Sequence, residues 1–251
     1  MSQRGGVRFG YISRMPDRTP PRPLLLLFDV NETLLDLTAL GESVASALGQ
    51  QGEEGKAAAS GWFTSMLHHS LVLVAGGRFE TFGDVGVATL KMAAAGRGIE
   101  LDDARAREAL APITSLAPHP DVRPALERLR EAGFRLVALT NSAHGAMEAQ
   151  LENASLRNLF HDALSVEEVG LYKPHTHVYR WACRRQGVAP EEAMMVAAHG
   201  WDVAGAQWAG LRAAFLARPP RQLFPLAPNP EIVADDLEDA ADALIALPAS
   251  G

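Results

Sequence analysis

Leu24-Leu-Leu-Leu-Phe28-Asp29-Val30 is the stretch of sequence that decides the fold. An uninterrupted apolar run of this length, without alternating polar positions, is typical of a β-strand buried on both faces, as in a parallel sheet. The aspartate that follows the run is expected at the carboxyl end of the strand. Ligands bind at that edge of open parallel sheets, so Asp29 is the first candidate for a functional residue.

Strand and helix patterns alternate along the rest of the chain. Gly133 ends one helical pattern just before a second buried strand begins. Such alternation predicts an α/β fold built on a Rossmann-like parallel sheet. The further strands are predicted at 135–140, 193–198 and 211–216, and the helices at 122–132, 178–187, 203–209 and 235–247.

The segment between the first two strands has a different character. It is rich in Ala, Leu, Glu and Gly and shows helical spacing without buried-strand runs. Helices are predicted in it at 41–48, 57–74, 79–95 and 102–110. The chain is therefore expected to divide into a flexible leader at 1–22, a core domain at 23–39 and 117–251, and a helical insertion at 40–116.

Composition narrows the classes of function. The chain has 251 residues, 47% hydrophobic, and a formal net charge of -7, which suits an ordinary soluble globular protein. No long basic stripe indicates a nucleic-acid partner, and the longest apolar run is far shorter than a membrane span. The N-terminus lacks the apolar segment of a secretory signal, so a cytoplasmic location is expected. The single cysteine, Cys183, excludes an internal disulfide.

Polar residues of catalytic type stand at or after the ends of the predicted strands. Because the carboxyl ends of parallel strands share one edge of the sheet, we expect their side chains to converge on Asp29. They are Thr140 and Asn141 after the second strand, Lys173 in the next loop, and His199 and Asp202 after the third strand.

Four ordered motifs resemble those of the haloacid dehalogenase superfamily. They are Asp29-Val-Asn-Glu-Thr33, Thr140-Asn-Ser142, Lys173-Pro174 and Trp201-Asp202-Val-Ala-Gly205-Ala206. The helical insertion also lies where that family carries its cap domain. Four motifs in order are far more specific than a single DxxxT. The phrases Lys173-Pro-x-x-x-Val178-Tyr179 and Trp201 to Ala206 are similar to the L-2-haloacid dehalogenase branch.

The resemblance implies a hydrolytic dehalogenase of small 2-haloalkanoic acids that needs no cofactor and no metal. Asp29 would displace the halide and form an ester, which water would then hydrolyse at the Asp29 carbonyl. Lys173 would keep Asp29 ionised, because a nearby cation favours the charged form. Asp202 would position the water or pair with Lys173, and His199 is a further catalytic candidate.

Other residues are expected to bind the substrate or to support the site. Hydrogen bonds from Thr33, Thr140 and Asn141 would reach Asp29 or the substrate carboxylate. A dry pocket would surround the carbon–halogen bond. The expected substrate-contacting residues are Val30, Asn31, Phe63, Thr140, Asn141, Trp201 and Tyr179. The expected partner is a small molecule, and similar proteins are commonly homodimers.

Two departures from the superfamily pattern weigh against a phosphatase. Phosphatases of the superfamily carry a second aspartate two residues after the nucleophile, where this chain has Asn31. They also usually carry two acidic residues in the fourth motif, where Asp202 stands alone, so magnesium bound by Asp29 and Asp202 would meet little negative charge. A magnesium-dependent phosphatase of a small phosphorylated metabolite is the second hypothesis.

Departures from the dehalogenase branch leave a third hypothesis open, a catalytically altered protein that keeps the fold. That branch has an arginine where this chain has Phe63 and an asparagine where it has His199. Arg78, His68 and His69 are the candidates for a replacement cation from the insertion.

Several candidates also have ordinary structural interpretations. Asp202 could cap the helix at 203–209, and His199 could be a hydrogen-bonded core histidine. Trp201 and Tyr179 could be core aromatic residues.

Overall fold

A parallel sheet forms the centre of the molecule. In the computed structural model, which describes residues 20–249, six strands pair in the order β3-β2-β1-β4-β5-β6. β1 pairs in parallel with both β2 and β4. All of its residues are fully buried, which explains why its sequence is apolar at every position. The strands are β1 (Leu25–Phe28), β2 (Arg135–Thr140), β3 (Asp162–Ser165), β4 (Ala193–Ala197), β5 (Arg212–Leu216) and β6 (Ile232–Ala234).

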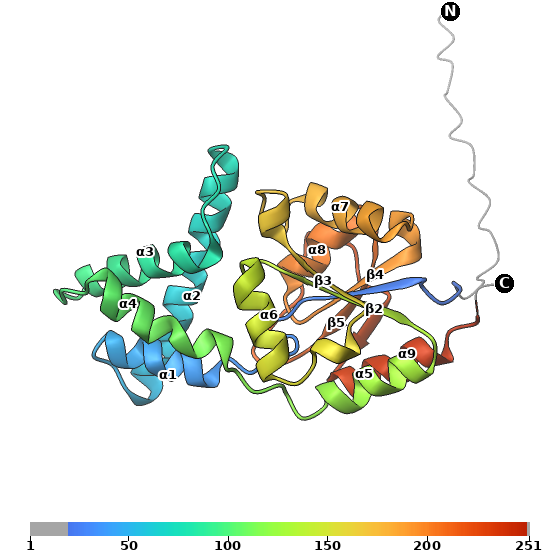
Figure 1. Cartoon of the computed structure of the whole chain (residues 1–251), viewed down its shortest axis with the longest axis horizontal. Helices are drawn as coiled ribbons and strands as arrows, with labels where there is room; N and C mark the ends of the chain where they lie inside the picture. Colours follow the sequence, from blue (N-terminus) through green and yellow to red (C-terminus); the bar gives the residue numbers. More distant parts are fainter. Residues whose placement is uncertain (1–19, 250–251) are drawn as a thin grey trace, which may run out of the picture.

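Helices cover both faces of the sheet (Figure 1). α5 and α9 lie side by side on one face, and α7 and α8 pack together on the other. The helices are α5 (Val122–Glu131), α6 (His144–Asn153), α7 (Thr176–Gln186), α8 (Gly200–Trp208) and α9 (Leu237–Ala246), with 3-10 helices η2 (Arg157–Leu159), η3 (Val166–Glu168) and η4 (Pro190–Glu192). The predicted α/β fold with a Rossmann-like parallel sheet is confirmed.

Further helices form a separate helical unit beside the sheet (Figure 1). α1 and α3 each pack against both α2 and α4. The unit consists of α1 (Thr38–Ala47), α2 (Gly52–Ala75), α3 (Phe82–Ala95) and α4 (Asp103–Leu110), followed by the 3-10 helix η1 (Ala111–Thr114). In the sequence, this unit lies between β1 and β2, and the division of the chain into a core domain and an insertion stays a prediction.

The sequence did not predict β3, β6 or α6. β3 begins and ends with the polar residues Asp162 and Ser165, so it has no continuous apolar run, and β6 has only three residues, of which Val233 is 59% exposed. α8 begins at Gly200, so Asp202 lies inside its first turn. The interpretation of Asp202 as a helix N-cap is therefore wrong.

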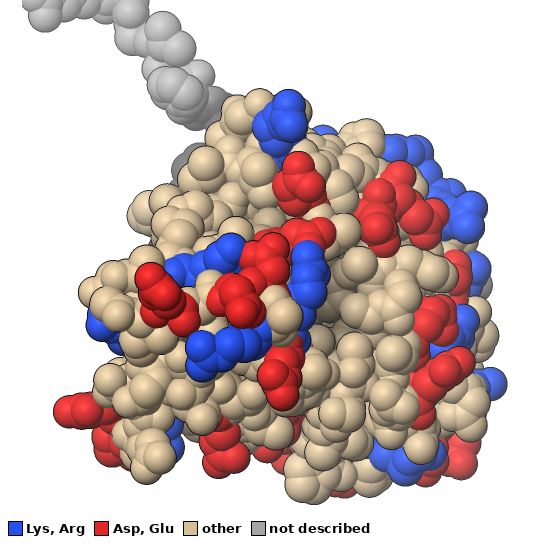
Figure 2. Space-filling model, turned by 60° about the vertical axis from the view of Figure 1, so that its left-hand side comes forward, with Lys and Arg blue, Asp and Glu red and all other residues tan. Residues whose placement is uncertain are grey.

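Residues 1–19 of the predicted leader, 1–22, lie outside the described residues. Its last residue, Arg22, donates from Nε to the Leu247 carbonyl and lies over the Phe134 ring, so it belongs to the folded core. Within residues 20–249, no helix has both the length and the apolar character that a membrane span requires. Acidic and basic side chains are interspersed on the face shown in Figure 2. The cytoplasmic location, the homodimer and the absence of a nucleic-acid partner stay predictions.

Candidate active site

The candidate site lies at the carboxyl edge of the sheet, where the strand order reverses between β1 and β4. Asp29 directly follows Phe28, the last residue of β1. The Asp29 backbone N–H donates to the Val196 carbonyl of β4 at 3.1 Å. The sheet thus fixes the backbone of Asp29, the candidate nucleophile, at the carboxyl end of β1. This is the edge of the sheet that the sequence predicted for it.

Lys173 joins Asp29 to Asp202 through a buried ammonium group. Its Nζ donates to Asp29 Oδ1 at 2.8 Å, to Asp202 Oδ2 at 2.7 Å and to the Leu139 carbonyl at 2.9 Å. An ammonium has three protons, so these bonds use all of them. Burial would lower the pKa of Lys173, but the charges of Asp202 and Asp29 raise it, and the lysine stays charged. Asn141 fixes the loop, because its Oδ1 accepts from the Lys173 backbone N–H at 2.9 Å.

The two carboxylates around Lys173 differ in acidity. Burial alone would raise the pKa of Asp29, but the Lys173 charge, together with His199, holds it well below its usual range. Burial raises the pKa of Asp202 against the opposing effect of Lys173. Tyr179 is fully buried and donates to Asp202 Oδ1 at 2.5 Å. Asp29 is therefore the carboxylate that more firmly keeps a negative charge, as a nucleophile must.

Thr33 connects the nucleophile to β4. Its Oγ1 donates to Asp29 Oδ2 at 2.7 Å and accepts from the Ala198 N–H at 2.9 Å. Because both bonds are buried, they fix the rotation of the Asp29 carboxylate. Thr33 lies in a turn four residues after Asp29, within the first motif, and this turn allows the expected hydrogen bond to Asp29.

His199 is the second cationic group next to Asp29. Its Nδ1 lies 3.3 Å from Asp29 Oδ2, and its Nε2 lies 2.6 Å from Glu32 Oε2. Burial would lower the pKa of His199, but the hydrogen bonds to Asp29 and Glu32 raise it to about 9. Its ring lies near two aromatic rings, Phe63 of α2 and Trp201 of α8. The core thus places a cation beside Asp29, and Phe63, the residue at the position of the branch's arginine, packs against its ring.

Glu32 and Arg221 are site residues that the sequence analysis missed. Glu32 has a backbone φ of 63°, in the left-handed region, where a non-glycine residue costs about 1–2 kcal/mol. Its carboxylate also forms an ion pair with Arg221, and its carbonyl lies 3.2 Å from His119 Nε2. One feature of the sequence could have pointed to Glu32: it is a charged residue between Asp29 and Thr33, the two fixed positions of the DxxxT pattern.

Two glycines of α8 allow loops to approach the site closely. A Cβ on Gly200 would lie 2.3 Å from the Gln222 carbonyl oxygen, so only glycine lets the loop that carries Arg221 cross there. A Cβ on Gly205 would lie 2.5 Å from Pro174 Cβ and 2.8 Å from Tyr179 Oη. The second glycine therefore sets how closely the Lys173 loop packs against α8.

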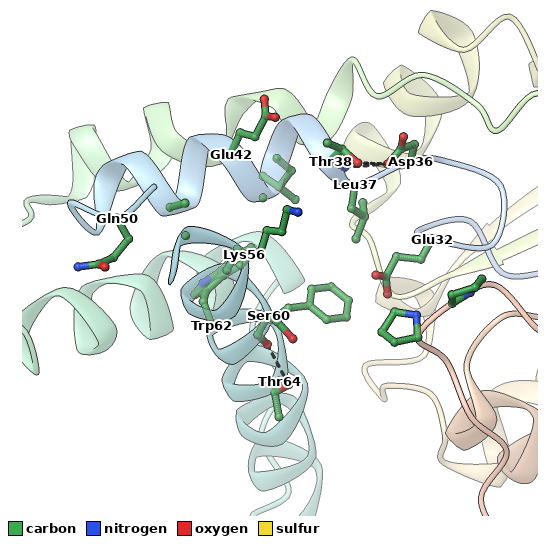
Figure 3. A pocket seen from close by; sticks show the side chains of 18 of the residues that line it. Glu32, Asp36, Leu37, Thr38, Glu42, Gln50, Lys56, Ser60, Trp62 and Thr64 are labelled. Atoms are coloured by element: carbon green, nitrogen blue, oxygen red, sulfur yellow. Dashed lines mark hydrogen bonds between the residues drawn. The ribbon is translucent and has the colours of Figure 1, made fainter. Parts of the chain in front are cut away.

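A cleft of about 800 Å³ opens between the helical unit and the core. In Figure 3, Glu32 lies on the core side, and Glu42, Lys56 and Ser60 come from the facing helices α1 and α2. Phe63 also lines the cleft, whereas Asp29 does not. His199 contacts both Glu32 and Asp29 and so links the lining of the cleft to Asp29.

The remaining predicted residues lie further from the charged group. Val30 has a fully buried side chain, and its carbonyl accepts from the N–H groups of Leu34 and Leu35. Thr140 Oγ1 accepts from the Ser142 N–H at 3.1 Å. Arg78 and His68 are exposed, and His69 Nδ1 lies 2.8 Å from the Ser65 carbonyl oxygen of its own helix. No contact between these three cation candidates and Asp29 occurs in the described structure.

The residues present do not fit a magnesium ion. Asp29 and Asp202 each give one oxygen to Lys173 Nζ, which lies between them. Their other oxygens already accept hydrogen bonds from neighbouring side chains. Within residues 20–249, no group of three or more His, Cys, Asp or Glu side chains is arranged to hold a metal.

The family model of the haloacid dehalogenase-like hydrolases matches residues 24–210. This chain belongs to that family, so the recognition from four motifs is confirmed. The (S)-2-haloacid dehalogenase H-109 of Pseudomonas putida is 26% identical over 220 residues, which are 88% of this chain and 97% of that protein. The (S)-2-haloacid dehalogenase 1 of Pseudomonas sp. (strain CBS-3) is 30% identical over 181 residues, 72% and 78% of the two chains. A solved L-2-haloacid dehalogenase has a TM-score of 0.83 at 26% identity, covering 90% of this chain and 100% of that one.

Proposed function

We propose that this hydrolase removes halide from small 2-haloalkanoic acids through an ester on Asp29. The observation that carries the proposal is the buried ion pair of Asp29 and Lys173 at 2.8 Å, at the sheet edge beside a cleft. It keeps a carboxylate ionised and oriented in a largely dry site, as nucleophilic displacement at carbon requires. Relatives named (S)-2-haloacid dehalogenases support the substrate class.

The two oxygens of Asp29 suit different roles. Among the described residues, Oδ2 accepts from Thr33 and His199, whereas Oδ1 accepts from Lys173 alone. A carboxylate oxygen has two lone pairs, so Oδ1 keeps one for the carbon that bears the halogen. The new O–C bond forms while the carbon–halogen bond breaks and its electron pair leaves with the halide. Water then attacks Cγ of the ester, releasing a 2-hydroxy acid and restoring the carboxylate.

Asp29→Asn tests the nucleophile. We expect wild-type protein to release halide from 2-chloropropionate without added magnesium, and the variant to lose at least about 1,000-fold of that rate. Asp235→Asn is the matched control, because Asp235 is exposed and remote from β1. A single turnover in heavy-oxygen water should place the solvent oxygen in the Asp29 carboxylate. Label found in the product alone would show direct attack by water and refute the ester.

The phosphatase hypothesis is disfavoured by the surroundings of Asn31. Its Nδ2 donates to Ser142 Oγ at 3.2 Å, and its Oδ1 accepts from Gln150 Nε2 at 2.9 Å. The amide is therefore held in a buried polar cluster, and no acid stands there to protonate a leaving group. Magnesium-dependent release of phosphate from a panel of small phosphate esters would reverse this choice. No turnover on either panel would favour the catalytically altered protein.

A further inference from the structure

His199 and Glu32 form a pair against the nucleophile that the dehalogenase resemblance does not explain. The two ring nitrogens of His199 face two carboxylates, Asp29 Oδ2 at 3.3 Å and Glu32 Oε2 at 2.6 Å. A neutral imidazole has one N–H and could donate to only one of them, whereas the doubly protonated ring donates to both. His199 is therefore a buried cation with one N–H directed at Asp29.

We propose that His199, oriented by Glu32, stabilises the oxyanion that forms on Asp29 Oδ2 during hydrolysis of the aspartyl ester. The inference rests on the proposed function, because it requires that ester. Once Oδ1 carries the substrate carbon, Oδ2 is the carbonyl oxygen of the ester. Thr33 and His199 already donate to that oxygen.

The hydrolysis step balances with these donors in place. Water adds to Cγ of Asp29, and the electron pair of the C=O bond moves to Oδ2. The pair returns as the Cγ–Oδ1 bond breaks, and the departing alkoxide takes one proton from the added water. The second proton of that water is released as Asp29 regains its charge. In the free carboxylate the charge is shared between Oδ1 and Oδ2, and in the ester it is absent, so a full negative charge is localised on Oδ2 only in this step, where preorganised donors act most strongly.

The packing around His199 favours a fixed donor. The Phe63 ring lies nearly parallel to the imidazole, with 6.2 Å between centroids and 21° between planes, and Trp201 lies at 5.1 Å. The 3.3 Å contact to Oδ2 is longer than the 2.6 Å contact to Glu32. Such a contact is expected to shorten when charge accumulates on the acceptor, because catalytic hydrogen bonds are often long in the free enzyme.

Glu32 is the positioning residue of the pair. Its φ of 63° is unusual for a residue with a side chain, and such strain persists only where the surroundings enforce it. Arg221 pairs with one oxygen of the carboxylate and His199 with the other. The strained backbone thus holds the carboxylate between two cations and aims it at the imidazole.

The charged groups around His199 make its role depend on pH. Asp29 and Glu32 contact it, Lys173 and Arg221 lie on the far sides of these carboxylates, and its aromatic neighbours carry no charge. Its pKa, which burial alone would lower, is raised to about 9 by the two carboxylates. Esterification removes the charge of Asp29, so in the intermediate the raised pKa depends on Glu32.

His199→Leu separates the two half-reactions. With enzyme in excess over 2-chloropropionate, halide release reports ester formation, and intact-protein mass reports the ester. We expect ester hydrolysis to slow about 100-fold or more, so that the ester accumulates. Halide release should slow much less, because Lys173 still holds Asp29 ionised. His199→Asn keeps a neutral donor and should recover part of the rate.

The outcomes of this experiment distinguish two failures. If halide release slows as much as turnover and no ester accumulates, His199 acts in the first step and the inference is wrong. If wild-type protein releases no halide from any 2-haloacid, the proposed function is wrong as well.

Variants of Glu32 keep the test decisive even if His199→Leu does not fold. Ester hydrolysis should be fast below the pKa of His199 and fall as the pH rises through it. Glu32→Gln should move this fall to lower pH, because the neutral amide no longer stabilises the charged ring. Glu32→Gly should do the same while relieving the backbone at φ 63°. A pH profile that neither variant moves would mean that Glu32 has a purely structural role.

Discussion

The two sides of the cleft are built from different kinds of residue. On the core side, Glu32 lines the cleft, and it and the carboxylates behind it, Asp29 and Asp202, are each paired with a cation at 3.3 Å or less. On the helical side, the cleft is lined by small residues, by the aromatic side chains of Trp62 and Phe63, and by charged side chains that reach into solvent. These residues include Gly41, Ala45, Gly55, Ala59 and Ser60, with Glu42 and Lys56 at the rim. We therefore expect the chemistry to depend on the core side and the choice of substrate to depend on the helical side.

The free-energy cost of removing a charged side chain differs between the two sides of the cleft. Removing one partner of a buried ion pair costs about 3–5 kcal/mol, because the other charge is left without compensation. The residues around Lys173 therefore constrain one another. Lys56, by contrast, has a 77% exposed side chain, and exposed pairs contribute about 0–1 kcal/mol. Exposed residues of the helical side, such as Lys56, can therefore vary with little loss of stability, and this is where we expect specificity to change.

Among the substitutions that compare the two sides, the largest effect is expected for Gly205→Ala, on the core side. The added Cβ would lie 2.5 Å from Pro174 Cβ, so the Lys173 loop must shift. A misplacement of about 1 Å near reacting groups costs about 100-fold in rate, and overpacking lowers the unfolding free energy by about 1–3 kcal/mol. Halide-release kinetics and urea denaturation measure the two effects.

Gly145→Ala is the control for that substitution. Gly145 lies in α6, and a Cβ there would meet nothing within 4 Å. Alanine is favoured over glycine in helices by about 1 kcal/mol, so stability should hold or rise and the rate should stay constant. Equal losses in both variants would show that the close approach at Gly205 has no special role.

The sequence predicted the parts of the site that local patterns encode. Asp29 follows an apolar strand, and Lys173, Asp202 and Thr33 belong to motifs, so their convergence followed from the order of strands in a parallel sheet. Asn31 was expected near the substrate, but the structure places it in a buried amide cluster. No local pattern reports which neighbour a polar side chain will meet.

The pair of Glu32 and Arg221 was beyond the reach of the sequence for the same reason. The two residues are 189 positions apart, and neither belongs to a recognised pairing. The double contact of His199 also depends on Glu32, whose side chain direction follows from a backbone conformation that its residue type does not favour. Tertiary packing, and not residue type, created this half of the site.

A smaller and selective effect is expected for Ala59→Leu, on the helical side. Ala59 lines the cleft opposite Gly41, so leucine fills part of a cavity much larger than a two-carbon haloacid needs. We expect kcat/KM for a long-chain 2-bromo acid to fall about 10-fold, as a few contacts in an apolar pocket allow, with 2-chloropropionate unaffected. Ala57→Leu is the control, since Ala57 is an exposed residue of α2 outside the cleft lining. Equal losses on both substrates would contradict a selective role for this wall.

The smallest effect is expected for Trp62→Phe, which tests whether the helical unit contributes to chemistry at all. Trp62 is 4% exposed and donates from Nε1 to the Gly86 carbonyl at 3.1 Å, joining α2 to α3. The Thr89 hydroxyl shares its one proton between the Val85 carbonyl at 2.8 Å and the Gly86 carbonyl at 3.1 Å, so the Gly86 acceptor keeps a partner within reach when the indole is removed. The loss should therefore be about 1 kcal/mol of unfolding free energy, the value of one net hydrogen bond, measured by urea denaturation. Halide release from 2-chloropropionate should stay at the wild-type rate, because the core-side ion pairs do not involve Trp62. A large fall in that rate with stability preserved would show that the helical side takes part in the reaction, and the division between the two sides would no longer hold.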